Sequence, residues 1–285
     1  MTESIPKRKS KMIRCKPLLG TYVEITLTEP KSDDDSIKVI NEAFVAIEQV
    51  QELMSFHHPQ SELSRINAQS HQTPLEIHPW TEEILRIAQG LHKHSDGLFN
   101  CGIGQHLIKA GLLPKHTELS QSHYGGIEHI QFLEPNLIRS DLPLCLDLGG
   151  IAKGFAVDKA VMSLEAAGVS SGIVNAGGDM RVFGEIAHPI HIRNPIKPDE
   201  LFQIGFMHDK AVATSGLYFS KSDAQSKSYL VNPLNLDHVD FPESYSIFAK
   251  ECVYADALSK VVALSGDLLH PCLNHYSSHA VRTPT

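Results

Sequence analysis

Hydrophobic and polar residues recur with two different periods along the chain, and these periods predict the order of strands and helices. A period of two, typical of a strand with one buried face, predicts a first strand from Tyr22 to Leu27. Apolar residues three and four positions apart then predict helices over 36–54 and 81–94, with a shorter helical turn over 61–67. The first half of the chain therefore begins with a strand that leads into covering helices.

The pattern is clearest in the middle of the chain, where a strand, a glycine-containing turn and a helix follow one another. Leucines at every second position from Leu142 to Leu148 predict the strand, and the apolar stripe from Val157 to Leu164 predicts the helix. The turn between them contains Gly149, Gly150, Lys153 and Gly154. Backbone N–H groups at a helix N-terminus attract anions, so a phosphate group fits this turn. A tight turn without any ligand is the other interpretation, because the spacing matches neither a P-loop nor Gly-x-Gly-x-x-Gly.

The second half of the chain is expected to be rich in strands. Between 98 and 114 we expect irregular structure, and between 217 and 228 a loop. The expected elements are a hairpin over 127–138, one strand interrupted by glycines over 171–184, strands over 190–193, 203–207, 211–214 and 245–249, and a helix over 255–265. Glycine pairs within a strand usually mark a bulge or the close approach of a ligand. Hairpins and helices without sustained strand–helix alternation favour an α+β fold.

Composition and charge narrow the functional classes. The chain has 285 residues, 42% of them hydrophobic and 20% charged, which is typical of a globular protein. A net charge of -8 and the absence of a basic region interleaved with aromatic residues argue against nucleic acid as a partner. No apolar stretch is long enough to span a bilayer, and the basic segment 7–11 has no apolar stretch after it, so a cytoplasmic location is expected. We expect residues 1–17 to form a flexible tail and residues 18–285 to form a single domain.

Cysteine and histidine spacing argues against a metal or redox site built from these residues. The five cysteines are scattered, with no Cys-x-x-Cys pair, and fit a reducing compartment. His275 and His279 have a metal-like spacing but no carboxylate beside them, so we do not expect a histidine-based metal site.

Several short motifs occur in a fixed order along most of the chain. They are Leu19-Gly20-Thr21, Met54-Ser55-Phe56-His57 with Ser61 to Asn67, Ser95-Asp96-Gly97-Leu98-Phe99-Asn100, the central stretch from Leu146 to Asp158, Val174-Asn175-Ala176-Gly177-Gly178-Asp179, Ala213-Thr214-Ser215-Gly216, and Ala255-Asp256-Ala257-Leu258. Their order and spacing together resemble the ApbE-type FAD:protein FMN transferases, from Leu18 to about Gly266. The chain is a divergent relative by this resemblance.

The resemblance implies an ApbE-like α+β fold with mixed or antiparallel sheets, covering helices and an FAD cleft between subdomains. Such enzymes move FMN from FAD onto a threonine or serine hydroxyl of a partner protein, form a phosphoester bond and release AMP, with Mg2+ beside the pyrophosphate. The implied FAD-contacting residues are Leu19, Phe56, Leu98, Phe99, Asn100, Asp147, Lys153, Thr214 and Tyr229. The implied metal-site positions are Gly150, Asp256 and Lys260, and the implied catalytic residues are Tyr229 and Asp256.

Three positions depart from the family pattern. The histidine expected to act as base is Tyr229, in the segment Tyr229-Leu230-Val231-Asn232-Pro233, and a phenol with a pKa near 10 is a poor base at neutral pH. The aspartate of the Gly-x-Phe-Asp motif is Asn100 here. The threonine expected four residues after the acidic metal ligand is Lys260, which lies one helical turn from Asp256.

These departures leave alternatives open. Lys260 is either a solvated helix lysine or an ammonium that replaces the Mg2+ beside Asp256. Asp147 either contacts FAD or only caps the following helix. Thr214 and Ser215 either orient phosphate oxygens or only satisfy hydrogen bonds at the end of a strand. The alternative functions are a catalytically degraded FAD-binding protein and a pyrophosphatase that hydrolyses FAD to FMN and AMP.

Overall fold

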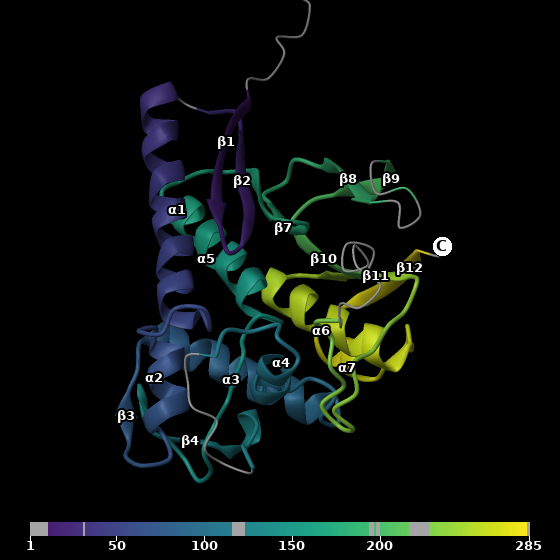
Figure 1. Ribbon diagram of the computed structural model, residues 1–285. Helices are drawn as coiled ribbons and strands as arrows, with labels where there is room; N and C mark the ends of the chain where they lie inside the picture. Colours follow the sequence, from purple (N-terminus) through teal and green to yellow (C-terminus); the bar gives the residue numbers. More distant parts are fainter. Residues whose placement is uncertain are drawn as a thin grey trace, which may run out of the picture.

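A seven-stranded antiparallel sheet forms the centre of the molecule (Figure 1). The computed structural model describes residues 11–30, 32–115, 123–193, 197, 200–216 and 228–283. The strand order is β1-β2-β6-β7-β10-β11-β12. The bounds are β1 Lys11–Leu18, β2 Thr21–Thr28, β6 Gly172–Ala176, β7 Asp179–Phe183, β10 Lys210–Gly216, β11 Ser244–Ala249 and β12 His279–Thr283. The prediction of an α+β fold is confirmed.

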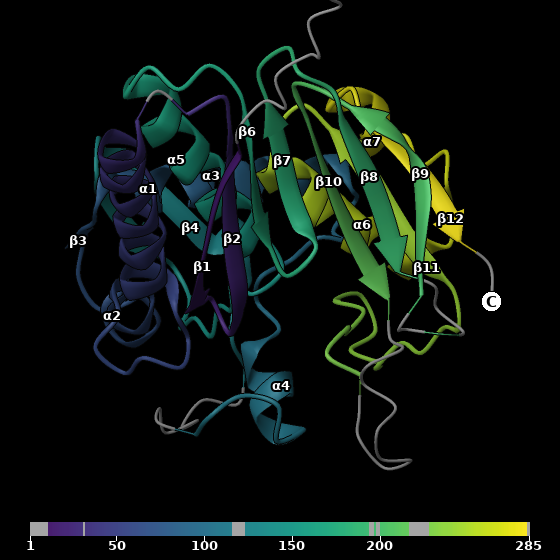
Figure 2. The ribbon, with the colours of Figure 1, turned by 90° about the horizontal axis from the view of Figure 1, so that it is seen from above.

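Three helices cover one face of this sheet (Figure 2). They are α1 (Asp33–Met54), α5 (Ala152–Ala166) and α6 (Cys252–Ser265), and α5 packs between the other two. The sequence predicts all three helices. In the structure α1 and α6 each begin three residues earlier than predicted. The predicted stripe on α5 is fully buried, including Val157 and Leu164. The main hydrophobic core lies between these helices and the sheet.

A two-stranded hairpin lies on the opposite face of the sheet (Figure 2). It consists of β8 (His188–Arg193) and β9 (Leu201–Met207), which pair with each other. A smaller hydrophobic cluster joins the hairpin to the sheet and contains Val182, Ile190, Met207 and Val212. Alternate residues of β10 therefore face opposite sides: Ala211 and Ala213 belong to the core under the helices, and Val212 belongs to this second cluster.

The segment between α1 and α5 adds a helical part at one end of the sheet (Figure 1). It contains α2 (Glu62–Gln69), α3 (Pro79–His94), α4 (Gly104–Lys109), a 3-10 turn η1 (Ile127–His129) and a small sheet of β3 (Leu75–Glu76), β4 (Ile130–Glu134) and β5 (Leu137–Ser140). The expected hairpin around Glu134 to Asn136 is confirmed. The expectation of irregular structure over 98–114 is wrong at α4. A short helix, α7 (Cys272–His275), follows α6 and is not predicted.

The expected N-terminal tail is wrong for residues 11–17, which belong to β1. Residues 1–10 lie outside the described part, as does most of the loop expected over 217–228. β1 pairs along its whole length with β2, and the connecting turn is formed by Leu19 and Gly20, both with positive φ (56° and 71°). Two-residue hairpin turns of this kind match the twist of the strands they join. The strand is hard to predict because it lies at the sheet edge, where charged residues such as Lys11 and Arg14 are tolerated.

The expected central strand before α5 is also wrong, because the segment from Leu144 to Leu148 joins no sheet and makes only one isolated bridge, at Leu144. It is extended and mostly buried, and a side chain replaces the neighbouring strand. The Asn67 amide donates to the Leu146 carbonyl (2.9 Å) and accepts from the Leu146 N–H (2.8 Å). The alternation of leucines therefore reports burial on one side of an extended segment and does not require a sheet.

The expected single strand over 171–184 consists of two strands, β6 and β7, that form a hairpin. Gly177 and Gly178 make its turn, with φ of 65° and 108°. The Asn175 side chain accepts a hydrogen bond from the Gly178 N–H (2.8 Å), which fits its interpretation as a residue that shapes the backbone. No helix in the described part of the chain is long and apolar enough to cross a membrane.

Candidate functional site

Four charged side chains meet where the first turn of α5 approaches α6 and the β6–β7 hairpin. Lys153 lies on α5, Asp179 begins β7, and Asp256 and Lys260 lie one turn apart on α6. The Lys153 ammonium pairs with Asp179 Oδ2 and lies 3.8 Å from Asp256 Oδ1. The Lys260 ammonium pairs with the same Asp256 Oδ1. Two carboxylates and two ammonium groups therefore form one continuous network.

The carboxylates of the network are more deeply buried than its lysines. The side chains of Asp256 and Asp179 are 0% and 6% exposed, whereas those of Lys260 and Lys153 are 21% and 32% exposed. The two lysine side chains are therefore the part of the network that solvent reaches.

A close contact between α5 and α6 fixes this arrangement. Gly154 donates its backbone N–H to Asp256 Oδ2 (2.9 Å), so Asp256 provides the negative charge that favours a helix N-terminus. A Cβ at Gly154 would lie 2.3 Å from the Cys252 carbonyl oxygen and 2.8 Å from Asp256 Cβ. Gly154 therefore allows the two helices to approach, and its N–H is used by the protein itself.

A second buried carboxylate holds the start of α6. Asp158 Oδ1 accepts from Arg181 Nη1 (2.8 Å) and the Cys252 N–H (2.9 Å), and Oδ2 accepts from the Val253 N–H (2.8 Å). Asp158 thus binds two backbone N–H groups in the first turn of α6, the position where a carboxylate stabilises a helix. Through α6 it sets the positions of Asp256 and Lys260.

The pKa values in the network reflect burial opposed by opposite charge. Burial alone would raise the pKa of Asp256, but Lys153, Lys260 and the Gly154 N–H hold that pKa below its ordinary value. Burial and the nearby Asp256 raise the pKa of Asp179. Burial would lower the pKa of Lys153, and the carboxylates of Asp179 and Asp256 outweigh it and raise that pKa above its ordinary value. Lys153 therefore carries a positive charge at neutral pH.

The glycine turn before α5 lies against this charged network. A Cβ at Gly150 would be 3.9 Å from Lys260 Cε and 3.9 Å from a ring carbon of Phe99, which places the turn between the lysine stem and the Phe99 ring. Asp147 accepts a hydrogen bond from the Gly149 N–H, and burial raises the pKa of Asp147. Asp147 thus stabilises the turn, but the expectation that it caps the following helix is wrong, because the N-cap of α5 is Ile151 and no side chain caps it. The structure brings five of the predicted site residues together, Gly150, Phe99, Lys153, Asp256 and Lys260.

The loop with Leu98 and Asn100 is held in place by its own contacts. Asn100 donates to Glu128 (2.9 Å) and accepts from the N–H groups of Gly102 (2.9 Å) and Ile127 (3.2 Å). The Asn100 amide therefore fixes the loop to the segment before β4. Leu98 is half-buried next to the buried Phe99.

Three other predicted site residues lie on different parts of the scaffold. Leu19 forms the β1–β2 turn, and its N–H donates to the Gln51 side chain (2.7 Å). Phe56 is buried just after α1. Tyr229 is 63% exposed, and its hydroxyl makes no hydrogen bond to any residue that the structure describes. Its segment lies near the Ser95–Asn100 loop, because a Cβ at Gly97 would lie 3.1 Å from Leu234.

Thr214 is not brought into the charged network. Its hydroxyl bonds to that of Ser246 (2.8 Å), on the face of the sheet away from α6. The next residue, Ser215, points to the α6 face and bonds to Ser259 (2.7 Å), which precedes Lys260. Strand periodicity could have identified Ser215, because it shares a face with the core residues Ala211 and Ala213.

Asp179 is the site residue that sequence reasoning missed. It closes the Val174–Asp179 motif, directly after the glycine turn of the β6–β7 hairpin. The motif contained the signal, since an acidic residue at a buried strand start is uncommon unless a positive charge lies beside it.

The donor set does not fit Mg2+. Both Asp256 oxygens have donors, one from Lys260 and one from the Gly154 N–H, and Asp179 bonds to Lys153. Mg2+ needs oxygen ligands in near-octahedral geometry, and two ammonium groups repel a divalent cation. Among the described residues, no group of three His, Cys, Asp or Glu side chains is arranged to hold a metal ion.

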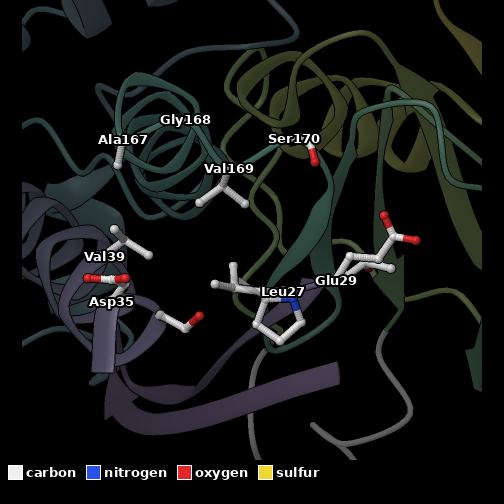
Figure 3. A pocket seen from close by; sticks show the side chains of 11 residues that line it. Leu27, Glu29, Asp35, Val39, Ala167, Gly168, Val169 and Ser170 are labelled. Carbon is white, nitrogen blue, oxygen red and sulfur yellow. The ribbon is translucent and has the colours of Figure 1, made fainter. Parts of the chain in front are cut away.

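The hollow shown in Figure 3 lies away from these charges. It has a volume of about 80 Å³ and lies between the end of β2, the start of α1 and the segment from Ala167 to Ser170. Ala167 follows Lys153 by 14 residues, which is about 20 Å along a helix. This hollow is therefore at the opposite end of α5 from the charged network.

Comparisons with known proteins identify the relatives of this chain. Residues 19–270 match the model described as the ApbE family. An FAD:protein FMN transferase from Vibrio cholerae is 26% identical over 269 residues, covering 88% of this chain and 80% of that protein. One from Chlamydia trachomatis is 28% identical, covering 81% of this chain and 76% of that protein.

Solved structures show the same fold. The flavin transferase ApbE from Vibrio cholerae has a TM-score of 0.82 at 23% identity and covers 96% of this chain and 94% of its own. The ApbE protein from Thermotoga maritima has a TM-score of 0.81 at 22% identity, with the same coverage.

Proposed function

The chain belongs to the ApbE family, and from this premise we propose that it is an FAD:protein FMN transferase that moves FMN from FAD to a partner protein. The names of the curated relatives from Vibrio cholerae and Chlamydia trachomatis support this function. The observation that carries it is the pair of partly exposed lysine side chains, Lys153 and Lys260, beside the glycine turn before α5. Such an arrangement suits a bound pyrophosphate.

The reaction forms one phosphoester bond and breaks one phosphoanhydride bond. The oxygen of an acceptor threonine or serine attacks the phosphorus on the FMN side of the pyrophosphate. The bond from that phosphorus to the bridging oxygen breaks, and AMP leaves with the bridging oxygen and the electron pair. The hydroxyl proton must be removed as the new bond forms. Phosphoryl transfer depends mainly on positioning and on neutralising the charge of the transferred group.

The two lysines supply that neutralisation. Lys153 and Lys260 would bind the pyrophosphate oxygens. The carboxylates of Asp179 and Asp256 would hold the two ammonium groups in position through their ion pairs. Asp256 thus acts as a positioning residue for both lysines. Phe99 and the backbone of Gly149 and Gly150 would form the wall of the nucleotide site.

Other predicted contacts complete the proposed FAD site. Leu19, Phe56, Leu98, Asn100, Asp147 and Thr214 are proposed to shape it or contact FAD. Asp147 and Asn100 support the proposal by fixing backbone turns. Thr214 lies on the sheet face away from α6, apart from the charged network, and has no such support.

Tyr229 is the proposed catalytic residue that receives the acceptor's proton. It occupies the position where the family resemblance places a histidine base, and its exposed ring is accessible to a protein acceptor. Only a phenolate can accept this proton, and few phenols are ionised near neutral pH, so transfer should be slow. Tyr229→His should raise the rate, and Tyr229→Phe should lower it.

The proposal is tested with the purified full chain, FAD and the proteins of the source organism. Transfer gives a fluorescent flavin band that survives a denaturing gel, and AMP in equal amount. Covalent flavin that is absent after incubation with both the membrane and the cytosolic fractions would contradict the proposal. Free FMN and AMP formed without any added protein would instead indicate the pyrophosphatase alternative.

A further inference from the structure

We propose that this enzyme binds the pyrophosphate of FAD without a divalent cation, because the ammonium group of Lys260 occupies the place of the metal ion beside Asp256. The inference rests on the proposed function, since it assumes that FAD is the ligand. It concerns Lys260, which replaces a metal ion. It follows from the contacts that the buried carboxylates of Asp179 and Asp256 already make.

The pair formed by Lys260 and Asp256 differs from an ordinary helix surface pair. Residues four apart on a helix often pair, and an exposed pair of this kind contributes little to stability. Here the Asp256 side chain is 0% exposed and the Lys260 side chain 21% exposed. A carboxylate without solvent needs a compensating charge in direct contact, and Lys260 provides it. The lysine is therefore part of the interior of the site.

Three of the four carboxylate oxygens of the network already have donors in contact. Asp256 Oδ1 bonds to Lys260 and lies 3.8 Å from the Lys153 ammonium, while Oδ2 accepts from the Gly154 N–H. Asp179 Oδ2 bonds to Lys153. A divalent cation would have to displace an ammonium group to reach Asp256 Oδ1 or Asp179 Oδ2.

Lys260 also lies where a pyrophosphate would need a cation. Its Cε carbon is 3.9 Å from the position of a Cβ on Gly150, in the turn that leads into α5. An anion bound at this turn would therefore contact the Lys260 ammonium directly. An ammonium group binds phosphate oxygens as a point charge and does not need the geometry that Mg2+ imposes.

The wild-type protein provides the first test, by titration with FAD in EDTA and in excess Mg2+. The proposal expects dissociation constants that agree within about twofold. FAD binding that is more than about tenfold tighter in Mg2+ would overturn the inference and leave the proposed function intact. Absence of FAD binding in both conditions would overturn the proposed function and this inference with it. Because this test uses only the wild-type protein, it does not depend on whether any variant folds.

Two variants of Lys260 sharpen the test. In EDTA, Lys260→Met should bind FAD at least about tenfold more weakly, the loss expected for a charge-assisted hydrogen bond. The exposed Lys38 on α1 gives the control: Lys38→Met should bind FAD like the wild type. Equal affinity of Lys260→Met and Lys38→Met would overturn the inference.

Mn2+ reports the metal site directly, without any catalytic readout. In the presence of FAD, Lys260→Thr should remove one equivalent of Mn2+ from the free-ion signal in electron paramagnetic resonance, because the substitution frees Asp256 Oδ1 and adds a hydroxyl oxygen. The wild-type protein should leave that signal unchanged. One equivalent of Mn2+ bound by the wild type at the same concentration would overturn the inference.

Discussion

The contact between α5 and α6 at Gly154 leads to a quantitative prediction, because any side chain at this position must displace backbone. A Cβ at residue 154 would lie 2.3 Å from the Cys252 carbonyl oxygen, closer than atoms of real side chains come. The Gly154 N–H also donates to Asp256 at 2.9 Å, so a shift that relieves the clash lengthens this hydrogen bond. Gly154→Ala therefore disturbs packing and the charged network together.

The expected magnitude follows from three opposing effects. Alanine is favoured over glycine in a helix by up to about 1 kcal/mol. Overpacking costs about 1–3 kcal/mol, and loss of a hydrogen bond to a charged group costs about 1.5–3 kcal/mol. We expect Gly154→Ala to lower the free energy of unfolding by about 1.5–6 kcal/mol. For a domain of this size the corresponding fall in Tm is roughly 3–24 °C.

Gly90 provides the matched control. It lies inside α3, and a Cβ there would meet only the Tyr276 hydroxyl, at 3.4 Å. Gly90→Ala should leave stability unchanged or raise it by up to about 1 kcal/mol. Urea denaturation of the two variants and the wild type, followed by far-ultraviolet circular dichroism, measures the difference. If Gly154→Ala is as stable as Gly90→Ala, helix propensity outweighs the contact and the reasoning about this helix pair is refuted.

Three further predictions test other charges. Lys153→Met leaves the buried Asp179 carboxylate without its partner and should lower the free energy of unfolding by about 3–5 kcal/mol in urea denaturation at neutral pH. The effect should shrink in acid, as Asp179 becomes protonated. Asp158→Asn should cost about 3–5 kcal/mol, because Arg181 stays buried without a carboxylate; its FAD affinity, measured by titration, should fall as well, since α6 is no longer held. The pKa of Glu82 is held below its ordinary value by a backbone N–H of the β4–β5 turn, so its stabilising effect is complete above about pH 4.3 and is lost as the pH falls through the lower folded-state pKa. Glu82→Gln should therefore flatten the acid side of a Tm-against-pH curve.

The exposed pair of Lys16 and Glu48 gives the control for the buried pairs. Their side chains are 42% and 40% exposed, so Lys16→Met should change stability by less than about 1 kcal/mol. Losses of stability as small as this in Lys153→Met and Asp158→Asn would contradict the claim that buried ion pairs contribute more to stability than exposed ones. Identical acid limbs for Glu82→Gln and the wild type would contradict the assigned role of Glu82.

The fold could be predicted from the sequence where one periodic pattern coincided with one regular element. The helices α1, α3, α5 and α6 have long apolar stripes, and each is found within a few residues of its expected bounds. The pattern fails to predict secondary structure where a segment has one buried face but its backbone is not paired with a strand. The segment from Leu144 to Leu148 has the leucines of a strand, but the Asn67 side chain and loop backbone replace a neighbouring strand. Hydrophobic periodicity indicates which side chains are buried. It does not identify the groups that hydrogen-bond to the backbone.

The candidate site was predictable in its residue types and less so in its geometry. Lys153, Asp256 and Lys260 lie on helices, where a spacing of four residues places two side chains on one face. Asp179 was missed because its partner, Lys153, is 26 residues away and is brought close only by the hairpin of β6 and β7. The order of strands in the sheet, which the sequence does not state, decides that contact.

The positions of the lysines and Tyr229 separate binding from chemistry in this protein. The lysines share two buried carboxylates, so removing either one changes the charge of the whole network and affects both stability and FAD affinity. Tyr229 is 63% exposed and outside that network. A change at Tyr229 should therefore alter the transfer rate while Tm stays constant. Substitutions in the two groups should be additive in FAD affinity, because residues that share no partner rarely couple. A double variant of Tyr229→Phe and Lys260→Met whose change in FAD-binding free energy differs from the sum of the two single changes would show that the two parts are connected.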